Sequence, residues 1–283
     1  MDRLTEYRRV PAPAKVNRFL HVLGRRPDGY HDLQTAFQFT QPSDFIDLRM
    51  RDDGSIRRTS SLPGVPPERD LVVRAASLLQ QYSNVAVGCD IHVDKAIPTG
   101  AGLGGGSSDA ASVLVALNRL WHCGVELDAL AQLGLQLGSD VPVFIRGHAA
   151  WGEGVGERLV AMEFDCPWVL LAVPDVNVST ATIFRDSLLT THSPPIKMCG
   201  SLRGTGNDCE QVTLLRYPAV RSLFDRLSEF GQARMSGTGG SVFVCFETAE
   251  AAEQAKRTLP PGLSCWVCQL VNRSPLLEWQ ERH

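Results

Sequence analysis

The sequence predicts an α+β protein with two domains, and three observations support this fold class. Segments with strand-like alternation and segments with helical periodicity both occur along the whole 283-residue chain. A glycine-containing connection at 147–156 separates two parts that each contain both kinds of segment. The length is long for one core and comfortable for two. We therefore expect an N-terminal domain at 1–157 and a C-terminal domain at 158–283.

The first domain is expected to begin with strands and continue with helices. Hydrophobic alternation predicts strands at 16–23, 45–49, 89–93 and 143–145. Periodicity predicts helices at 71–82, at 127–137 and in a segment that follows a run of glycines, with Ser107 or Ser108 as its cap. The apolar stripe of this last helix consists of Ala110, Val113, Leu114, Leu117 and Trp121.

The second domain is expected to be a sheet with helices on one face. Strands are predicted at 169–173, 241–246 and 265–270, and helices at 217–230 and 249–259.

Composition and charge narrow the class of partner. The net charge of −3 argues against nucleic acid as the main partner, because phosphate backbones are bound by an excess of Lys and Arg. No apolar stretch is long enough to span a bilayer, and the N-terminus lacks the apolar core of a secretory signal. We therefore expect a cytoplasmic protein without a membrane partner.

The eight cysteines are expected to be reduced thiols, since no secretory signal precedes them. Cys265 and Cys268 have the spacing of a zinc ligand pair, but no second pair follows them. We interpret them as residues of a strand.

The segment 100–106 is mostly glycine and leads directly into a helix. Glycine allows positive φ and lets an anion approach the backbone N–H groups, and a helix N-terminus adds unpaired donors. The hydroxyls of Ser107 and Ser108 are available to phosphate or to magnesium. A turn without a ligand is the alternative, but so many glycines are entropically costly for a turn alone. The segment therefore predicts a triphosphate site.

Two other phosphate motifs fit this segment less well. Residues 100–105 match G-x-G-x-x-G formally, but a dinucleotide site needs an acidic residue at a strand end about twenty residues later. That distance falls on 119–123, at the end of a helix. A Walker A loop is excluded because no Gly-Lys-Ser/Thr follows the glycines.

Three ordered segments, 13–17, 98–108 and 235–240, resemble the three motifs of the GHMP kinase family. Segments 24–35, 138–144 and 207–210 are most similar to members whose acceptor is a cytidine-diphosphate-linked alcohol. The resemblance implies an N-terminal domain like domain 2 of ribosomal protein S5 and a ferredoxin-like C-terminal domain. It also implies transfer of the ATP γ-phosphate to a hydroxyl of this small molecule. The chemistry of ATP implies Mg²⁺, because the metal neutralises phosphate charge.

The resemblance also assigns roles to residues. Lys15 and Asp140 match the catalytic pair, and the sequence leaves open whether Asp140 removes the hydroxyl proton or only positions the hydroxyl. Tyr30 and Phe184 match aromatics that sandwich the cytosine, and His31 matches a residue at its edge. The predicted nucleotide site is Lys95, Pro98, Thr99, Gly100, Ala101, Gly102, Leu103, Gly104, Gly105, Gly106, Ser107 and Ser108. The predicted acceptor site is Asn17, Tyr30, His31, Thr180, Phe184 and Gly239.

Departures from the family pattern occur at Arg18, at Asp70 and at 204–206, and they affect fine nucleotide contacts more than the reaction. The alternatives are a GHMP kinase for homoserine or a mevalonate derivative, an NAD-dependent oxidoreductase and a non-catalytic nucleotide-binding module. Metal ligands cannot be read from spacing, and the protein is expected to be a monomer or a weak homodimer.

Overall fold

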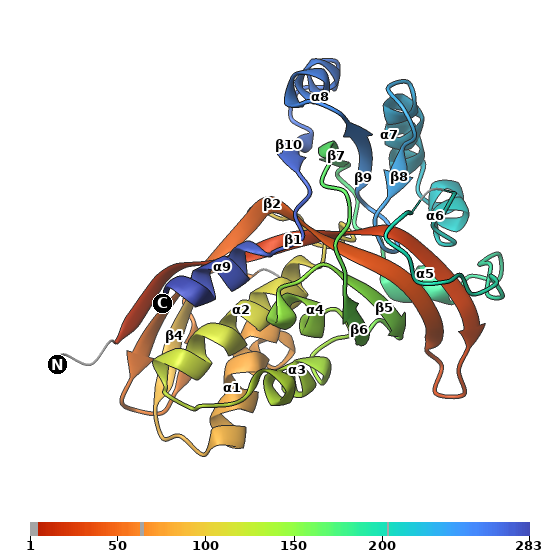
Figure 1. Cartoon of the computed structure of the whole chain (residues 1–283). Helices are drawn as coiled ribbons and strands as arrows, with labels where there is room; N and C mark the ends of the chain where they lie inside the picture. The colour runs from red at the N-terminus through yellow and green to blue at the C-terminus, as the bar shows by residue number, and fades with distance from the viewer. Residues whose placement is uncertain (1–4, 63–64, 203) are drawn as a thin grey trace.

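The computed structural model describes residues 5–62, 65–202 and 204–283. It contains a six-stranded sheet and a four-stranded sheet. In Figure 1, the first sheet crosses the middle of the molecule, helices α1–α4 lie below it, and the second sheet stands above it with its own helices. The mixed α+β class is therefore confirmed.

Two long antiparallel strands, β1 (Glu6–Arg25) and β2 (His31–Arg51), form the backbone of the first sheet. Their buried runs are nearly continuous, because helices cover one face while the second sheet and the chain around Ile196 and Leu202 cover parts of the other. Register shifts interrupt the pairing at several points, including between Pro13 and Lys15 and between Asn17 and Leu20. Such irregularities re-aim side chains locally.

The first sheet has the order β3-β4-β2-β5-β6, with β1 paired to β2. Its remaining strands are β3 (Ile56–Arg58), β4 (Gly88–Asp94), β5 (Ala150–Gly154) and β6 (Arg158–Ala161). The last helix, α9 (Pro275–Arg282), also packs here, with Leu276 and Trp279 in the N-terminal core. Both β6 and α9 come after residue 157, and the domain boundary at 157/158 stays a prediction.

The helices of the first part follow the apolar periodicity closely, with two corrections. They are η1 (Pro67–Arg69), α1 (Leu71–Ser83), α2 (Gly105–Leu120), α3 (Leu127–Leu135) and α4 (Val141–Arg146). The predicted strand at 143–145 is wrong, because Pro142 lies in the first turn of α4 and is compatible with a helix start. The predicted cap is also wrong: α2 begins at Gly105 with Gly104 as its N-cap, so Ser107 and Ser108 lie inside it.

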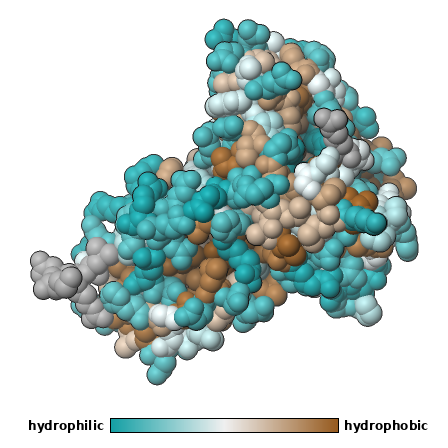
Figure 2. Space-filling view, viewed as in Figure 1, coloured by the Kyte–Doolittle hydropathy of each residue, from teal (hydrophilic) through white to brown (hydrophobic). Residues whose placement is uncertain are grey.

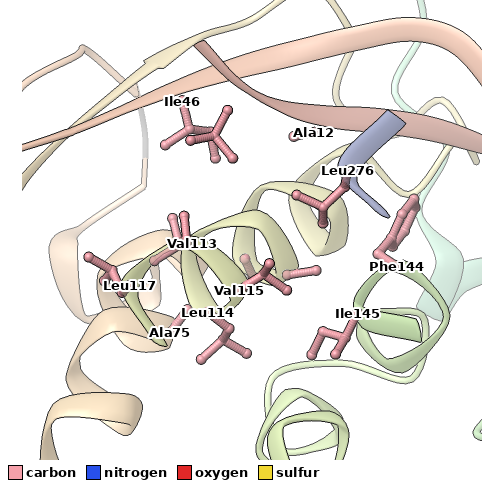
Figure 3. Close-up of a cluster of buried hydrophobic side chains, with 14 of the residues drawn as sticks. Ala12, Ile46, Ala75, Val113, Leu114, Val115, Leu117, Phe144, Ile145 and Leu276 are labelled. Carbon is pink, nitrogen blue, oxygen red and sulfur yellow. The ribbon is translucent and has the colours of Figure 1, made fainter. Parts of the chain in front are cut away.

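Figure 3 shows how the core joins these elements. Val113, Leu114 and Leu117 of α2 are fully buried, as the predicted stripe requires. They share one cluster with Ile46 of β2 and Phe144 of α4. Each such side chain contributes about 1.5–3 kcal/mol by burial, so α2 and the glycine segment before it are firmly fixed.

The second sheet has the order β10-β7-β9-β8 and is antiparallel throughout. Its strands are β7 (Trp168–Val173), β8 (Arg234–Met235), β9 (Val242–Phe246) and β10 (Ser264–Gln269). The accompanying helices are α5 (Thr180–Phe184), α6 (Glu210–Arg216), α7 (Pro218–Ser228) and α8 (Ala249–Lys256). The order along the chain is β7, three helices, β8, β9, α8 and β10, which is the order of a ferredoxin-like unit.

The visible face in Figure 2 is mostly hydrophilic, and its apolar groups form separate patches. Exposed large apolar side chains such as Tyr82, Leu127 and Met198 come from different parts of the chain. Within the described ranges, no helix is both long and apolar enough to cross a bilayer. Cys265 and Cys268 are free thiols in β10, as the strand interpretation requires.

Candidate active site

A cavity of about 940 Å³ lies where the two sheets meet. Its lining comes from β1, β2, the glycine segment, the start of α4, α5 and the turn between β8 and β9. Both predicted catalytic residues line it, as do the predicted nucleotide-site residues from Lys95 to Ser107. Asn17, Tyr30, His31, Thr180 and Phe184 line it as well. The fold thus brings residues far apart in sequence to one cavity.

Two glycines of the segment 100–106 are required by close approach as well as by positive φ. Gly102 has φ +74°, and a Cβ there would lie 2.3 Å from the Ser236 carbonyl oxygen. Gly104 has φ +72°, and its Cβ would lie 2.9 Å from the Phe144 ring and 3.1 Å from Lys15 Cε. Both positions therefore exclude other residues. The backbone N–H groups at the start of α2 line the cavity and are suited to an anion.

The two serines after the glycines have different positions. Ser107 lines the cavity, so its hydroxyl is available to a ligand. Ser108 is fully buried inside α2, and it is not among the residues that line the cavity. The predicted contact of Ser108 with the nucleotide is therefore not supported by its position.

Lys95 lies at the cavity between two buried carboxylates. Its Nζ donates to Asp44 and, at 2.9 Å, to Asp109 Oδ2. Asp44 Oδ1 also accepts from the backbone N–H groups of Ala96 and Ile97 at 2.6 and 2.8 Å. Burial lowers the stability of the charged lysine, but Asp109 and Asp44 together raise the pKa of Lys95. Burial also raises the pKa of Asp109 to about 7.

Lys15 and Asp140 form the second charged group of the cavity. Lys15 Nζ lies 3.2 Å from Asp140 Oδ2, and it donates to Asn17 Oδ1 at 2.6 Å and to the Gly102 carbonyl at 3.2 Å. The Lys15 side chain is 4% exposed and that of Asp140 is 29% exposed. The buried Lys15 ammonium is thus fixed by its partners. It holds the Asp140 carboxylate at a position that a ligand in the cavity can reach.

Aromatic residues form another part of the cavity lining. His31 and Phe184 are stacked, with ring centroids 5.2 Å apart and an interplanar angle of 23°. Tyr30 is 64% exposed at the cavity mouth. Burial and the nearby Arg25 guanidinium lower the pKa of His31, so the ring is neutral near pH 7, with one donor and one acceptor nitrogen.

The third glycine turn reaches the cavity through residues of the predicted motif 235–240 that were not among the predicted site residues. Gly237 and Thr238 line the cavity, and Gly239 does not. A Cβ on Gly239 would lie 2.6 Å from Thr213 Cγ2 and 2.8 Å from Met235 Sδ, so this glycine packs against protein. The position of Gly239 therefore gives no support to its predicted contact with the acceptor.

Sequence reasoning also missed Arg58 and Ser236. Arg58 lines the cavity and pairs with Asp70 at 3.0 Å, and Asp70 caps α1 by accepting from the Val72 N–H. Ser236 Oγ accepts from Asn17 N at 3.1 Å and donates to the Gly102 carbonyl at 3.0 Å. The unusual acid at position 70 was a usable signal for Arg58, whereas Ser236 gave no signal beyond its place in the third motif.

The Arg18 departure is explained by a buried polar network outside the cavity lining. Its guanidinium donates to Gln38 Oε1 at 2.7 Å and to the Asp165 carboxylate at 3.1 Å. The departure at 204–206 is compatible with strand pairing, because the Gly206 carbonyl accepts from Leu20 N at 3.0 Å.

The donor set suits magnesium only in combination with phosphate. Within the residues that the structure describes, no group of three His, Cys, Asp or Glu side chains could hold a metal ion. Mg²⁺ is commonly bound through one or two protein oxygens, substrate phosphates and water. The Ser107 hydroxyl, at the end of the glycine segment, is a cavity-lining oxygen that fits this requirement.

Family comparisons agree with this geometry. The family described as "GHMP kinases N terminal domain" matches residues 70–148, and "GHMP kinases C terminal" matches residues 195–261. The chain belongs to the GHMP kinase family.

Curated relatives are similar over nearly the whole chain. A Halorhodospira halophila protein is 53% identical over 96% of both chains, and a Xanthomonas axonopodis protein is 50% identical over 98% of both. Each is named 4-diphosphocytidyl-2-C-methyl-D-erythritol kinase.

Solved structures of GHMP kinases share this fold at different levels of sequence identity. A 4-(cytidine 5′-diphospho)-2C-methyl-D-erythritol kinase has a TM-score of 0.77 and 31% identity, covering 94% of this chain and 98% of that one. A homoserine kinase from Cytophaga hutchinsonii has a TM-score of 0.65 at 17% identity, covering 97% of both chains, and shares the fold alone.

Proposed function

We propose that the protein transfers the γ-phosphoryl group of ATP to the 2-hydroxyl of 4-diphosphocytidyl-2-C-methyl-D-erythritol. The products are the 2-phosphate and ADP, and the reaction belongs to the non-mevalonate route to isoprenoid precursors. The observation that carries the proposal is one cavity with a glycine-lined helix N-terminus, the Lys15–Asp140 pair and the His31–Phe184 pair. The names of relatives that are about 50% identical support the same acceptor.

The glycine segment and the start of α2 provide the site for the ATP phosphates. Their backbone N–H groups face anionic oxygens without intervening side chains. Lys95, fixed by Asp44 and Asp109, adds a positive charge beside this segment. Magnesium, when bound, would be held by the ATP phosphates with the Ser107 hydroxyl, and it would neutralise phosphate charge.

Lys15 and Asp140 act on the acceptor. Phosphoryl transfer depends mainly on positioning and on charge stabilisation. Asp140 accepts a hydrogen bond from the acceptor hydroxyl, which aligns the oxygen for attack and offers a site for its proton. The Lys15 ammonium, fixed by Asn17 and Gly102, orients Asp140 and stabilises the oxygen as the proton leaves.

The aromatic part of the cavity lining selects the base. His31 offers both a donor and an acceptor to a pyrimidine edge. Phe184 and Tyr30 provide aromatic surface, and stacking contributes about 1–3 kcal/mol per base. Homoserine and mevalonate have no base to stack, so these residues favour the cytidine-linked acceptor over those of the alternative GHMP kinases.

The decisive experiment is an ADP-release assay with a panel of acceptors. The panel contains 4-diphosphocytidyl-2-C-methyl-D-erythritol, homoserine, mevalonate and phosphomevalonate, each with ATP and Mg²⁺. We expect turnover with the first compound and background rates with the others. Turnover with another member of the panel, and none with the cytidine compound, would overturn the proposal.

A further inference from the structure

The segment between α5 and α6 contributes a residue with no assigned role, Asn207. This residue lies beside β1, where the Asp208 N–H donates to the Leu20 carbonyl at 2.9 Å. The Asp208 carboxylate also accepts from Val22 N at 2.6 Å. The backbone of Asn207 is thereby fixed to the strand that carries Lys15 and Asn17.

Both polar atoms of the Asn207 side chain make hydrogen bonds, and two of these bonds hold the third glycine turn. Its Nδ2 donates to the carbonyls of Met235 at 2.9 Å and Gly237 at 2.8 Å. Its Oδ1 accepts from the Cys209 N–H at 3.0 Å. One amide thus connects β1 to the turn between β8 and β9.

This connection sets the direction of the peptide between Gly237 and Thr238. In a trans peptide, the C=O and the N–H point in opposite directions. Because Asn207 holds the Gly237 carbonyl, the Thr238 N–H points away from Asn207. Gly237 and Thr238 line the cavity, and within the described part of the chain the Thr238 N–H donates to no acceptor.

This N–H belongs to a turn that is close both to the catalytic pair and to the helix of Phe184. A Cβ on Gly237 would lie 3.3 Å from Asn17 Oδ1, beside the catalytic pair. The Thr238 hydroxyl lies 3.0 Å from the Thr180 hydroxyl, on the helix that carries Phe184. In a cytidine-diphosphate-linked alcohol, the diphosphate lies between the base and the alcohol.

We propose that Asn207 is a positioning residue that directs the Thr238 N–H into the cavity, where it donates to a phosphate oxygen of the acceptor's diphosphate. This inference rests on the proposed function. The ATP phosphates are the other possible source of such an oxygen, and the experiment separates the two.

The experiment compares cytidine 5′-diphosphate with cytidine as probes. Each is titrated calorimetrically into the full-length wild type and the Asn207→Ser variant, whose hydroxyl is too short to replace the amide. Asn118→Ser is the matched control, because both polar atoms of the Asn118 side chain similarly hold the backbone of Val125, which lies in the turn after α2.

Loss of a hydrogen bond to a charged group predicts roughly 10- to 100-fold weaker binding of the diphosphate by Asn207→Ser. Cytidine binding is expected to change less than about twofold by the same reasoning.

Kinetics supply the second measurement. Asn207→Ser is expected to raise the acceptor KM by the same factor and to leave the ATP KM within about twofold, since the lost bond belongs to one substrate. Asn118→Ser is expected to lower the melting temperature without changing either KM. If Asn207→Ser does not fold, Asn207→Asp, which keeps the bond from Cys209 N–H, replaces it with the same expectations.

Three results would overturn the inference. They are unchanged diphosphate affinity, equal weakening of diphosphate and cytidine, or an effect confined to the ATP KM. If the wild type turns over the cytidine acceptor but the Asn207→Ser variant shows one of these results, the inference fails and the proposed function stands. If the wild type neither phosphorylates that acceptor nor prefers the diphosphate to cytidine, both fail.

Discussion

Lys15 is a buried cation whose surroundings explain why the cavity can hold a reactive carboxylate in place. Its ammonium group has contacts with Asp140, Asn17 and the Gly102 carbonyl, from three separate segments. A charge removed from water is tolerated only with such partners. The same contacts that stabilise Lys15 therefore fix the position of Asp140 relative to the glycine segment.

We expect Asp140→Asn to lower kcat by roughly 10²–10⁴, because a positioned base contributes about that factor. The ATP KM should stay near the wild-type value, since the glycine segment is untouched. Asp128→Asn is the control: Asp128 pairs with Arg146 on the surface, and its side chain is 83% exposed. Steady-state ADP release measures both variants, and a near-native kcat for Asp140→Asn would contradict the role of Asp140.

Helix α2 shows which parts of an element the sequence predicts. The spacing of Val113, Leu114 and Leu117 predicted the helix and its buried face, because that face packs by simple periodicity. The start was predicted wrongly because Gly105 and Gly106 are poor helix formers. Gly105 lies in the helix for a tertiary reason: a Cβ there would lie 3.1 Å from Ile97 Cγ2.

The same limit applies to α4 and to the site. The short apolar run 143–145 suits a strand and a helix equally, and only its packing in the core made the helix clear. Motif residues such as Lys15 and Gly102 could be found in the sequence because their chemistry requires particular residue types. Arg58 had only the indirect signal of its partner Asp70, 12 positions away. Ser236 could not be found as a site residue, because its role comes from Asn17 and Gly102, which are 219 and 134 positions away.

The buried contact between Asp109 of α2 and Lys95 predicts that the free energy of unfolding depends on pH. The folded protein raises the pKa of Asp109 to about 7, through burial first, whereas an unfolded chain holds it near the ordinary value of about 4. The folded state therefore binds more protons between these values, and this group lowers the free energy of unfolding as the pH rises through that window.

Asp109→Asn should remove this contribution. As the pH rises from 5 to 7.5, the free energy of unfolding of the variant is expected to increase relative to that of the wild type. Urea titrations at both pH values measure the difference, and the comparison cancels the titrating groups that do not interact with Asp109. A difference that is the same at the two pH values would contradict the expected proton uptake.

At the scale of the whole molecule, the two sheets are joined by a hydrophobic cluster and by backbone hydrogen bonds. Phe39 of β2 and Val271 exchange two backbone hydrogen bonds of 3.2 and 3.0 Å. Near the cavity, Ser241 N donates to the Ala101 carbonyl at 2.8 Å. Ser236 is the central contact, because its hydroxyl bonds both β1 and the glycine segment.

Ser236→Ala therefore tests whether this junction matters for catalysis as well as for stability. Removing the hydroxyl leaves the Asn17 N–H and the Gly102 carbonyl without this partner, which should cost about 1–3 kcal/mol of unfolding free energy. It should also lower kcat/KM by roughly tenfold or more, since small displacements of reacting groups reduce rates strongly.

Ser112→Ala is the matched control, because Ser112 is equally buried and donates to the Pro11 carbonyl at 2.8 Å within the N-terminal core. We expect Ser112→Ala to lose comparable stability and to keep kcat/KM within about twofold, since it lies away from the junction. Equal effects of the two substitutions on kcat/KM would mean that the junction contributes only stability.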